Sequence, residues 1–261
     1  MRYIAIFFIF LFSPYLAFAK QVEVVVGWTK APYVIEENDS GFEVELVRAI
    51  LLEMGHEMIP IYVPFGRTAS FVRSGEVDMG LTLNPWHDID PAILSNNYVH
   101  YQNVAITRTD RNLQINQVKD LLGYSIIGFQ TASSVLGDEF GKLLAHQKNY
   151  MELAQQDRQV HLLLLGSVDV AVLDRNIFEH IKKGLPQEKQ HDTTIHELFP
   201  VSSYSAAIPD PYLRSQFNQI LAKFIEDGRY QSLLEEFGLF NFLSEKSSTS
   251  TINPNPVNSY N

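Results

Sequence analysis

The residues Val22-Glu23-Val24-Val25-Val26 form a β-branched run that ends at Gly27, and this run opens the part of the chain that decides the fold. The run predicts a strand, and strand-like and helix-like segments then alternate along the chain. The predicted strands cover 22–26, 58–63 and 77–83, and the predicted helices cover 42–54 and 69–74. This β-α-β-α-β order is typical of an α/β sheet with helices on its faces.

A second unit of the same kind begins near Ile126 and is joined to the first through Asn103 to Arg108. We expect strands over 125–129 and 168–173, and helices over 160–165 and 175–183. Another helix is predicted to run to about Ala145, with Ser133 or Ser134 as its N-cap. The sequence therefore predicts two α/β units.

The C-terminal part predicts a strand over 204–208 and helices over 212–227 and 230–237. If these elements pack on the first unit, the chain crosses between the units twice and they share a two-stranded hinge. Periodicity alone leaves this second crossing open. Residues 244–261 are rich in Ser, Thr, Asn and Pro, and we expect them to be disordered.

The N-terminus has the order of regions found in a secretory signal peptide. Arg2 is followed by an apolar stretch from Tyr3 to Phe12 and then by Ala17-Phe18-Ala19, so cleavage is expected after Ala19. The alternative is a membrane anchor, but the apolar stretch is short for a bilayer and Pro14 follows it. With no cysteine to carry a lipid, we expect residues 20–261 to be free, soluble and monomeric.

Composition excludes several classes of function. The formal charge is −10, which argues against nucleic acid and anionic membrane surfaces as partners. The absence of cysteine removes disulfides, thiol catalysis and Cys-rich metal sites. The eight histidines are scattered without metal-ligand spacing, and no cofactor motif occurs, so we expect neither metal nor cofactor.

Five short motifs, in order over about 22–240, resemble those of the family 3 extracellular solute-binding proteins, which include binding proteins of polar amino acid transporters. They are Gly41-Phe42-Glu43-Val44-Glu45-Leu46, Ser74-Gly75-Glu76-Val77-Asp78, Gly128-Phe129-Gln130-Thr131-Ala132-Ser133-Ser134, Gly166-Ser167-Val168-Asp169-Val170-Ala171-Val172-Leu173-Asp174 and Glu226-Asp227-Gly228-Arg229-Tyr230. The resemblance implies a two-lobed α/β fold that closes over a ligand. It also supports the second crossing, with the first lobe at 20–106 and 204–243 and the second lobe at 107–203.

The resemblance implies a periplasmic protein that captures a small amino-acid-like ligand and delivers it to the membrane permease of an ABC importer. Two alternatives share the scaffold: a receptor subunit that presents a ligand to a membrane sensor, and an enzyme such as a dehydratase. An enzyme needs a general acid or base in the cleft, and nothing in the sequence singles out that chemistry. We therefore expect a binding protein and no catalytic residue.

The family binds a ligand ammonium with an aspartate, and Asp174 falls at that place, at the C-terminal end of a strand. The alternative role of Asp174 is an N-cap for the helix that starts at Arg175. The family binds a ligand carboxylate with helix N-terminal amides and an arginine. Ser133 and Ser134 match the helix start, and simple capping is their alternative role.

The arginine is the main departure from the family. At Thr82-Leu83-Asn84-Pro85-Trp86-His87 the family commonly has T-x-T-P-E-R, and His87 stands at or near the arginine's position. We expect His87 to be an exposed loop residue, and Arg67 to be a substitute cation or a surface arginine. Thr82 is predicted to contact the ligand.

Aromatic side chains follow several predicted strands and can form the walls of a cleft. They are Trp28, Tyr33, Phe65 and Trp86. Packing in the core of a lobe is the alternative for each. Trp28, Tyr33 and Phe65 complete the predicted ligand site.

Overall fold

The computed structural model describes residues 20–28, 30–144 and 147–242. The predicted signal peptide and the predicted disordered tail lie outside these residues, so both stay predictions. Within the described ranges, no helix has the length and apolar character needed to cross a membrane.

The first lobe is built on a mixed five-stranded sheet in the order β2-β1-β3-β10-β4. Its strands are β1 (Lys20–Gly27), β2 (His56–Val63), β3 (Met79–Leu83), β4 (Leu94–Tyr101) and β10 (Ser202–Ala207). Strands β1, β2 and β3 are parallel, and β10 runs antiparallel to both β3 and β4. The helices of this lobe are α1 (Phe42–Glu53), α2 (Thr68–Ser74), α7 (Pro211–Glu226) and α8 (Arg229–Glu236).

The second lobe has its own five-stranded sheet in the order β7-β6-β8-β5-β9. Its strands are β5 (Asn103–Arg108), β6 (Ile126–Phe129), β7 (Tyr150–Leu153), β8 (Val170–Asp174) and β9 (Thr193–His196). Its helices are α3 (Ala132–Val135), α4 (Asp138–Leu144), α5 (Gln156–Leu164) and α6 (Arg175–Lys183).

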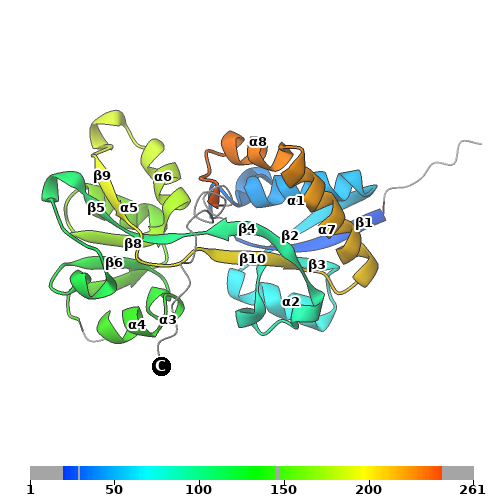
Figure 1. The fold of residues 1–261 in the computed structure, drawn as a ribbon, viewed down its shortest axis with the longest axis horizontal. Coiled ribbons are helices and arrows are strands. Elements are labelled where there is room, and N and C mark those ends of the chain that lie inside the picture. Colours follow the sequence, from blue (N-terminus) through cyan, green and yellow to red (C-terminus); the bar gives the residue numbers. More distant parts are fainter. Residues whose placement is uncertain (1–19, 29, 145–146, 243–261) are drawn as a thin grey trace, which may run out of the picture.

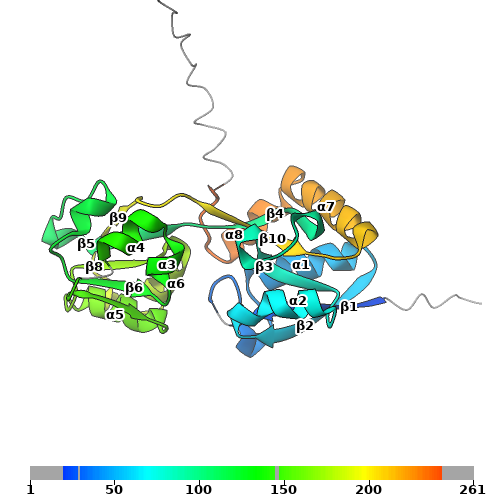
Figure 2. The ribbon, with the colours of Figure 1, turned by 90° about the horizontal axis from the view of Figure 1, so that it is seen from below.

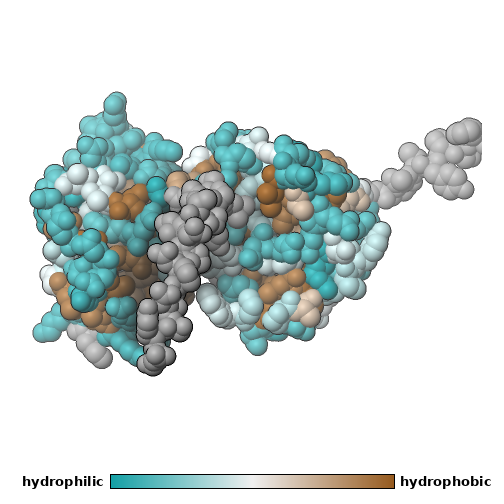
Figure 3. Space-filling model, viewed as in Figure 1, coloured by the Kyte–Doolittle hydropathy of each residue, from teal (hydrophilic) through white to brown (hydrophobic). Residues whose placement is uncertain are grey.

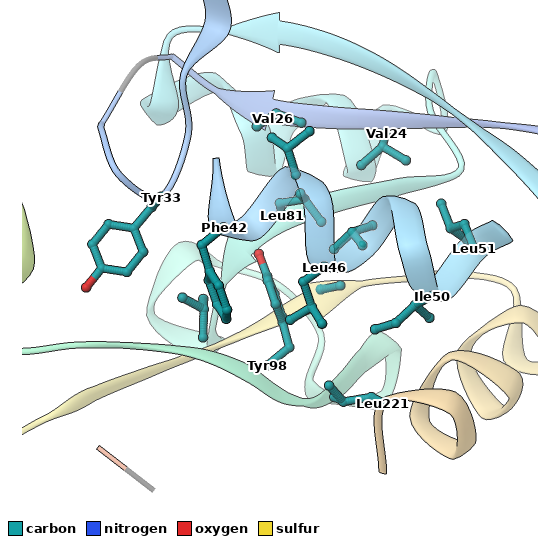
Figure 4. Close-up of a cluster of buried hydrophobic side chains, with 14 of the residues drawn as sticks. Val24, Val26, Tyr33, Phe42, Leu46, Ile50, Leu51, Leu81, Tyr98 and Leu221 are labelled. Atoms are coloured by element: carbon teal, nitrogen blue, oxygen red, sulfur yellow. The ribbon is translucent and has the colours of Figure 1, made fainter. Parts of the chain in front are cut away.

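The β-branched run of β1 is buried because both faces of its sheet are covered. Val24 and Val26 belong to a core shared with α1, α7 and α8 (Figure 4), while Val25 packs with α2 residues on the opposite face. A parallel strand covered on both faces needs apolar residues at successive positions. The apolar residues at successive positions of β1 are thus explained by the helices that cover both faces of the sheet.

Two extended segments connect the lobes, and the two-lobed α/β prediction with a two-strand hinge is confirmed (Figures 1 and 2). The chain leaves the first sheet after β4, enters the second at β5, and returns between β9 and β10. Strand β5, which our boundary at 106 divides, belongs whole to the second sheet, and β10 belongs whole to the first. The face seen in Figure 3 is mainly hydrophilic, with separate small hydrophobic patches on both lobes.

The helix predicted to start at Ser133 or Ser134 differs from the structure. Thr131 occupies the N-cap position without a side-chain cap, and α3 ends after one turn at Val135. Gly137, with φ of 93°, separates α3 from α4. A residue in this left-handed region ends a helix, so one predicted helix becomes two short ones.

Candidate functional site

Glu43 is the centre of a buried polar cluster in the first lobe. It lies in the first turn of α1 and is completely buried. Lys30 Nζ lies 3.0 Å and Tyr101 OH 2.6 Å from Glu43 Oε1, while Thr82 Oγ1 lies 2.6 Å and Tyr98 OH 2.5 Å from Oε2. We call these five residues the Glu43 cluster.

The Glu43 carboxylate is charged in spite of its burial. Burial acts to raise the pKa of Glu43, but the Lys30 ammonium and the three hydroxyl donors outweigh it and hold that pKa below its usual value. Burial also raises the pKa of the Tyr98 and Tyr101 hydroxyls well above their usual value. Both tyrosines therefore keep the protons that they donate.

Thr82 is held in an unusual backbone conformation at this cluster. Its φ is 57°, a left-handed value that is rare for a β-branched residue. The Thr82 amide donates to Tyr98 OH at 3.0 Å, and the hydroxyl of Thr82 lies 2.9 Å from Lys30 Nζ. Strain of this kind persists only where the surroundings fix the residue, and here it turns the end of β3 toward Glu43.

Asp174 forms a second buried cluster at the C-terminal end of β8. It is 3% exposed and caps α6 by accepting from the Ile177 amide at 3.0 Å. It also accepts from the Gln102 amide at 2.9 Å and from Tyr33 OH at 3.2 Å. Asn176 Nδ2 donates to the same Tyr33 oxygen at 2.9 Å. We call these residues the Asp174 cluster.

The Asp174 carboxyl is poised to titrate. Burial raises its pKa to about 6, even though the hydrogen bonds that it accepts oppose the shift. Its capping role is present in the structure. A direct ligand contact requires Tyr33 OH to give way, because three donors already engage the two oxygens.

Tyr33 links the two clusters and the two lobes. It extends from the first lobe away from the other labelled core side chains (Figure 4), and its hydroxyl meets Asp174 of the second lobe. Its ring stacks on Tyr101 with 3.9 Å between the ring centroids. The structure thus brings together three predicted site residues, namely Tyr33, Thr82 and Asp174.

A cavity of about 280 Å³ lies beside these clusters, between the lobes. Lys30 and Ala31 line it from the first lobe, and the second lobe contributes the start of α5 and one face of α6. The residues from the second lobe are Ala154, Gln155, Gln156, Asp157, Ile177 and Ile181. None of the residues that line this cavity was predicted from the sequence as a site residue.

Arg67 and Trp28 lie on the surface in this conformation. Arg67 is exposed and places its guanidinium 5.5 Å from the ring centroid of Phe71, and Trp28 is 53% exposed. The backbone of Phe65 begins the short 3-10 helix η2 (Phe65–Arg67), directly after β2. Whether these three residues contact a ligand stays a prediction.

The amides near Ser133 already have an anionic partner within the protein. Glu152 accepts from the Thr131 amide at 2.7 Å and from the Ser133 amide at 2.8 Å. The Ser134 amide donates to the Thr131 carbonyl at 2.9 Å. A ligand carboxylate would have to displace Glu152, so the predicted role of Ser133 and Ser134 stays a prediction.

The His87 side chain forms a hydrogen bond with the backbone of its own loop. It lies in η3 (Pro85–His87), half-buried, and its Nδ1 accepts from the Asn84 amide at 3.2 Å. Burial lowers the pKa of His87, and the nearby Lys30 charge adds to that effect. A neutral imidazole cannot replace a guanidinium as a carboxylate clamp.

Metal binding has no support in the part of the chain that the structure describes. No group of three or more His, Asp or Glu side chains there is placed to hold a metal ion.

No curated protein matches the chain. The ligand-binding core of GluR0 with L-glutamate is similar with TM-score 0.67 and 15% identity, covering 84% of this chain and 98% of that one. A histidine kinase sensor domain with similarity to periplasmic binding proteins is similar with TM-score 0.65 and 18% identity, and the match covers 84% of this chain and 96% of that one. An amino acid ABC transporter substrate-binding protein from Streptococcus pneumoniae, bound to L-arginine, is similar with TM-score 0.62 and 18% identity. That match covers 83% of this chain and 94% of the other.

These structural similarities, all below 25% identity, show the shared two-lobed fold. The sequence identifies the family as well as the fold, because a family model matches residues 22–240, which span both lobes. This protein belongs to the bacterial extracellular solute-binding proteins, family 3.

Proposed function

We propose that this protein is an exported binding protein that captures a small polar, amino-acid-like solute between its lobes and delivers it to an ABC importer. The observation that carries the proposal is the pair of buried carboxylate clusters where the lobes meet, beside a cavity lined from both lobes. Buried charges cost free energy unless they are paired, and they mark sites that recognise polar ligands. The family and the amino acid complexes among its structural relatives support the ligand class.

Asp174 and Tyr33 couple binding to closure in this proposal. The ligand ammonium replaces Tyr33 OH on Asp174, whose other donors, the amides of Gln102 and Ile177, keep it in place. Closure brings Trp28, which follows β1, and Phe65 and Arg67, which follow β2, toward the second lobe. The rotation occurs at the two segments that join the sheets.

The proposed setting is the periplasm, with residues 1–19 removed as a signal peptide and the mature protein monomeric. The proposed partner is the membrane permease of an importer. The proposed role is binding without chemical turnover.

A second role, as a ligand-presenting sensor subunit, is favoured by one observation. A histidine kinase sensor domain shares the fold over 84% of this chain. Loss of uptake of the bound solute on deletion of the gene supports transport, whereas unchanged uptake with altered transcription supports sensing.

Binding is tested by a thermal-shift screen of the L-amino acids, followed by calorimetric titration. Asp174→Asn keeps a capping residue at α6 but loses the charge, and removing one partner of a buried charged contact costs roughly 3–5 kcal/mol. We expect binding to weaken at least about a hundredfold. Asp210→Asn is the matched control, because Asp210 caps α7 by accepting from the Tyr212 and Leu213 amides, outside both clusters. Unchanged affinity in Asp174→Asn would show that Asp174 is only a helix cap.

A further inference from the structure

The cavity between the lobes has an unequal distribution of charge. Lys30, from the first lobe, is the one cation among the described residues that line it. On the second lobe, Asp157 lines the cavity, and so does Ile177, whose amide is bound to Asp174. One wall therefore attracts an anion and the other attracts a cation.

Lys30 lines the cavity, and its ammonium is anchored by the Glu43 cluster. Nζ lies 3.0 Å from Glu43 Oε1 and 2.9 Å from Thr82 Oγ1, and 5.1 Å from the centroid of the Tyr101 ring. The side chain keeps 17% of its surface exposed while Glu43 has none. The Lys30 side chain is therefore more accessible to an incoming anion than the Glu43 carboxylate.

Glu43 does not depend on Lys30 alone. Thr82, Tyr98 and Tyr101 also donate to it, so its charge is distributed over four donors. Lys30 can therefore shift toward a second anion while Glu43 keeps three hydrogen bonds. A lysine ammonium suits this role because it carries several donors on one compact charge.

The other positions predicted for an anion are less suitable. Arg67 is exposed and lies over Phe71, and the Ser133 amide is bound to Glu152. His87 is half-buried, and its Nδ1 already accepts a backbone hydrogen bond. Lys30 differs from all three in lining the cavity shared by both lobes.

We infer that Lys30 binds the anionic group of the amino-acid-like ligand in this cavity, with the cationic group directed to the opposite wall, which contains Asp157. This inference rests on the proposed function and adds the residue that receives the anion. The amides of Gln155 and Gln156 complete the polar lining, and Ala154, Ile177 and Ile181 offer apolar contact.

The test compares L-alanine, L-serine and L-glutamine with their α-carboxamides, in which a neutral amide replaces the carboxylate. Calorimetric titration of the parent protein should show at least about tenfold tighter binding of the acid in any pair that binds. Lys30→Met combined with Glu43→Gln keeps the cluster neutral, and it should reduce this preference to about twofold or less. A thermal melt checks that the double variant is folded.

Two further variants test the cavity without altering the Glu43 cluster. Ala154 is exposed and lines the cavity, so Ala154→Leu should fill the space and weaken binding of the acids at least about tenfold. Asp138→Asn is the control for Asp157→Asn, because each aspartate lies in the first turn of a helix but Asp138 is remote from the cavity. Asp157→Asn should weaken the acids about threefold or more, and Asp138→Asn should behave as the parent.

The outcomes separate this inference from the proposed function. If the parent binds acids and carboxamides equally, if the double variant keeps the preference, or if Ala154→Leu binds as the parent does, Lys30 is not the anion site and the inference fails alone. If the parent binds none of the L-amino acids in the wider screen, the proposed ligand class fails and the inference fails with it.

Discussion

At the scale of single residues, Asp174 performs a structural task that is compatible with its proposed role in ligand binding. It caps α6, accepts from Gln102 next to the first crossing and meets Tyr33 of the other lobe. Each contact fixes the carboxyl in place, while burial makes its charge costly. Asp174 is therefore fixed in position by neutral donors, namely Tyr33 OH and the amides of Gln102 and Ile177, which suits the proposed binding of an ammonium.

The raised pKa of Asp174 makes stability depend on pH. The folded value of about 6 exceeds the ordinary 3.8, so the folded state binds the proton more tightly. This contribution is fully present below pH 4 and is lost as the pH rises toward 6. Its full size is about 3 kcal/mol, since one pKa unit corresponds to 1.36 kcal/mol.

Asp174→Asn removes this titration. Relative to the parent, the variant should gain stability as the pH rises from about 4 to 6, and the difference should level off above pH 7. Thermal melts of both proteins at several pH values measure it, because other titrating groups cancel in the comparison. A constant difference across this range would show that Asp174 does not titrate there.

Glu43 gives a prediction about stability. Glu43→Gln leaves the Lys30 ammonium without its carboxylate in a mostly buried position, which costs roughly 3–5 kcal/mol. The matched control is Glu45→Gln, two residues along α1, whose partly exposed pair with Arg48 is worth at most about 1 kcal/mol. Urea denaturation should separate the two variants clearly, and equal losses would mean that the buried Glu43–Lys30 pair contributes no more than a partly exposed ion pair.

Prediction from sequence reached part of this site. Asp174 and Thr82 lie at the C-terminal ends of strands, and a residue at a strand end can be placed from the sequence pattern. Glu43 was missed because a carboxylate near the start of a helix normally interacts with solvent and the helix dipole. Its burial depends on Tyr98 and Tyr101, which come from a strand with no clear sequence signal.

At the scale of elements, Gly41 determines how α1 meets the loop that carries Lys30 and Tyr33. Its φ is 110°, and a Cβ atom there would lie 2.5 Å from the Tyr33 carbonyl oxygen. Such a separation forces the backbone to move. The start of α1 and the Tyr33 segment can therefore be adjacent only with glycine at this position.

Gly41→Ala should be far more damaging than Gly75→Ala. Gly75 also has a left-handed φ, of 73°, but a Cβ there would meet nothing within 4 Å. Gly75→Ala should cost about 1 kcal/mol from backbone strain alone, and Gly41→Ala several times as much. Chemical denaturation measures both. Equal costs would show that the loop gives way easily.

The elements differ in how well their sequences predict them. Strand β1 contains a β-branched run, β8 is apolar from Val170 to Leu173, and α6 and α7 have clear caps, so these were predicted. Strands β4, β7 and β9 were not predicted. The strand β4 contains two adjacent asparagines, β7 has four residues including Glu152, and β9 has a histidine and two threonines. Their pairing partners, rather than their own propensities, make them strands.

At the scale of the whole molecule, the lobes touch at more than the hinge. Arg175 of α6 lies 4.2 Å from the ring centroid of Phe240, and the Phe240 amide donates to Asn176 Oδ1 at 2.9 Å. Ile177 also packs in the core of the first lobe. In the proposed closure over a ligand, the lobes move against these existing contacts, which restrict the direction of the rotation.

Closure predicts a change in molecular dimensions. The radius of gyration in solution scattering should fall when the parent protein is saturated with the L-amino acid that most raises its melting temperature. Tyr33→Phe removes the hydroxyl that joins the lobes through Asp174, so its ligand-free radius should differ from that of the parent. An unchanged radius at saturation would contradict hinge closure.

The position of β10 between β3 and β4 affects the order in which the two lobes fold. As the chain emerges with its N-terminus first, β1 to β4 appear early, yet β4 joins their sheet only when residues 202–207 follow, because β10 lies between β3 and β4. The strands of the second lobe all lie within residues 103–196, so its sheet can form before β10 of the first lobe has been synthesised. Pairings this distant in sequence are slow to form. The late-arriving strand thus makes the first lobe the last to fold, and it leaves the half-made sheet in need of protection from aggregation until the chain is complete.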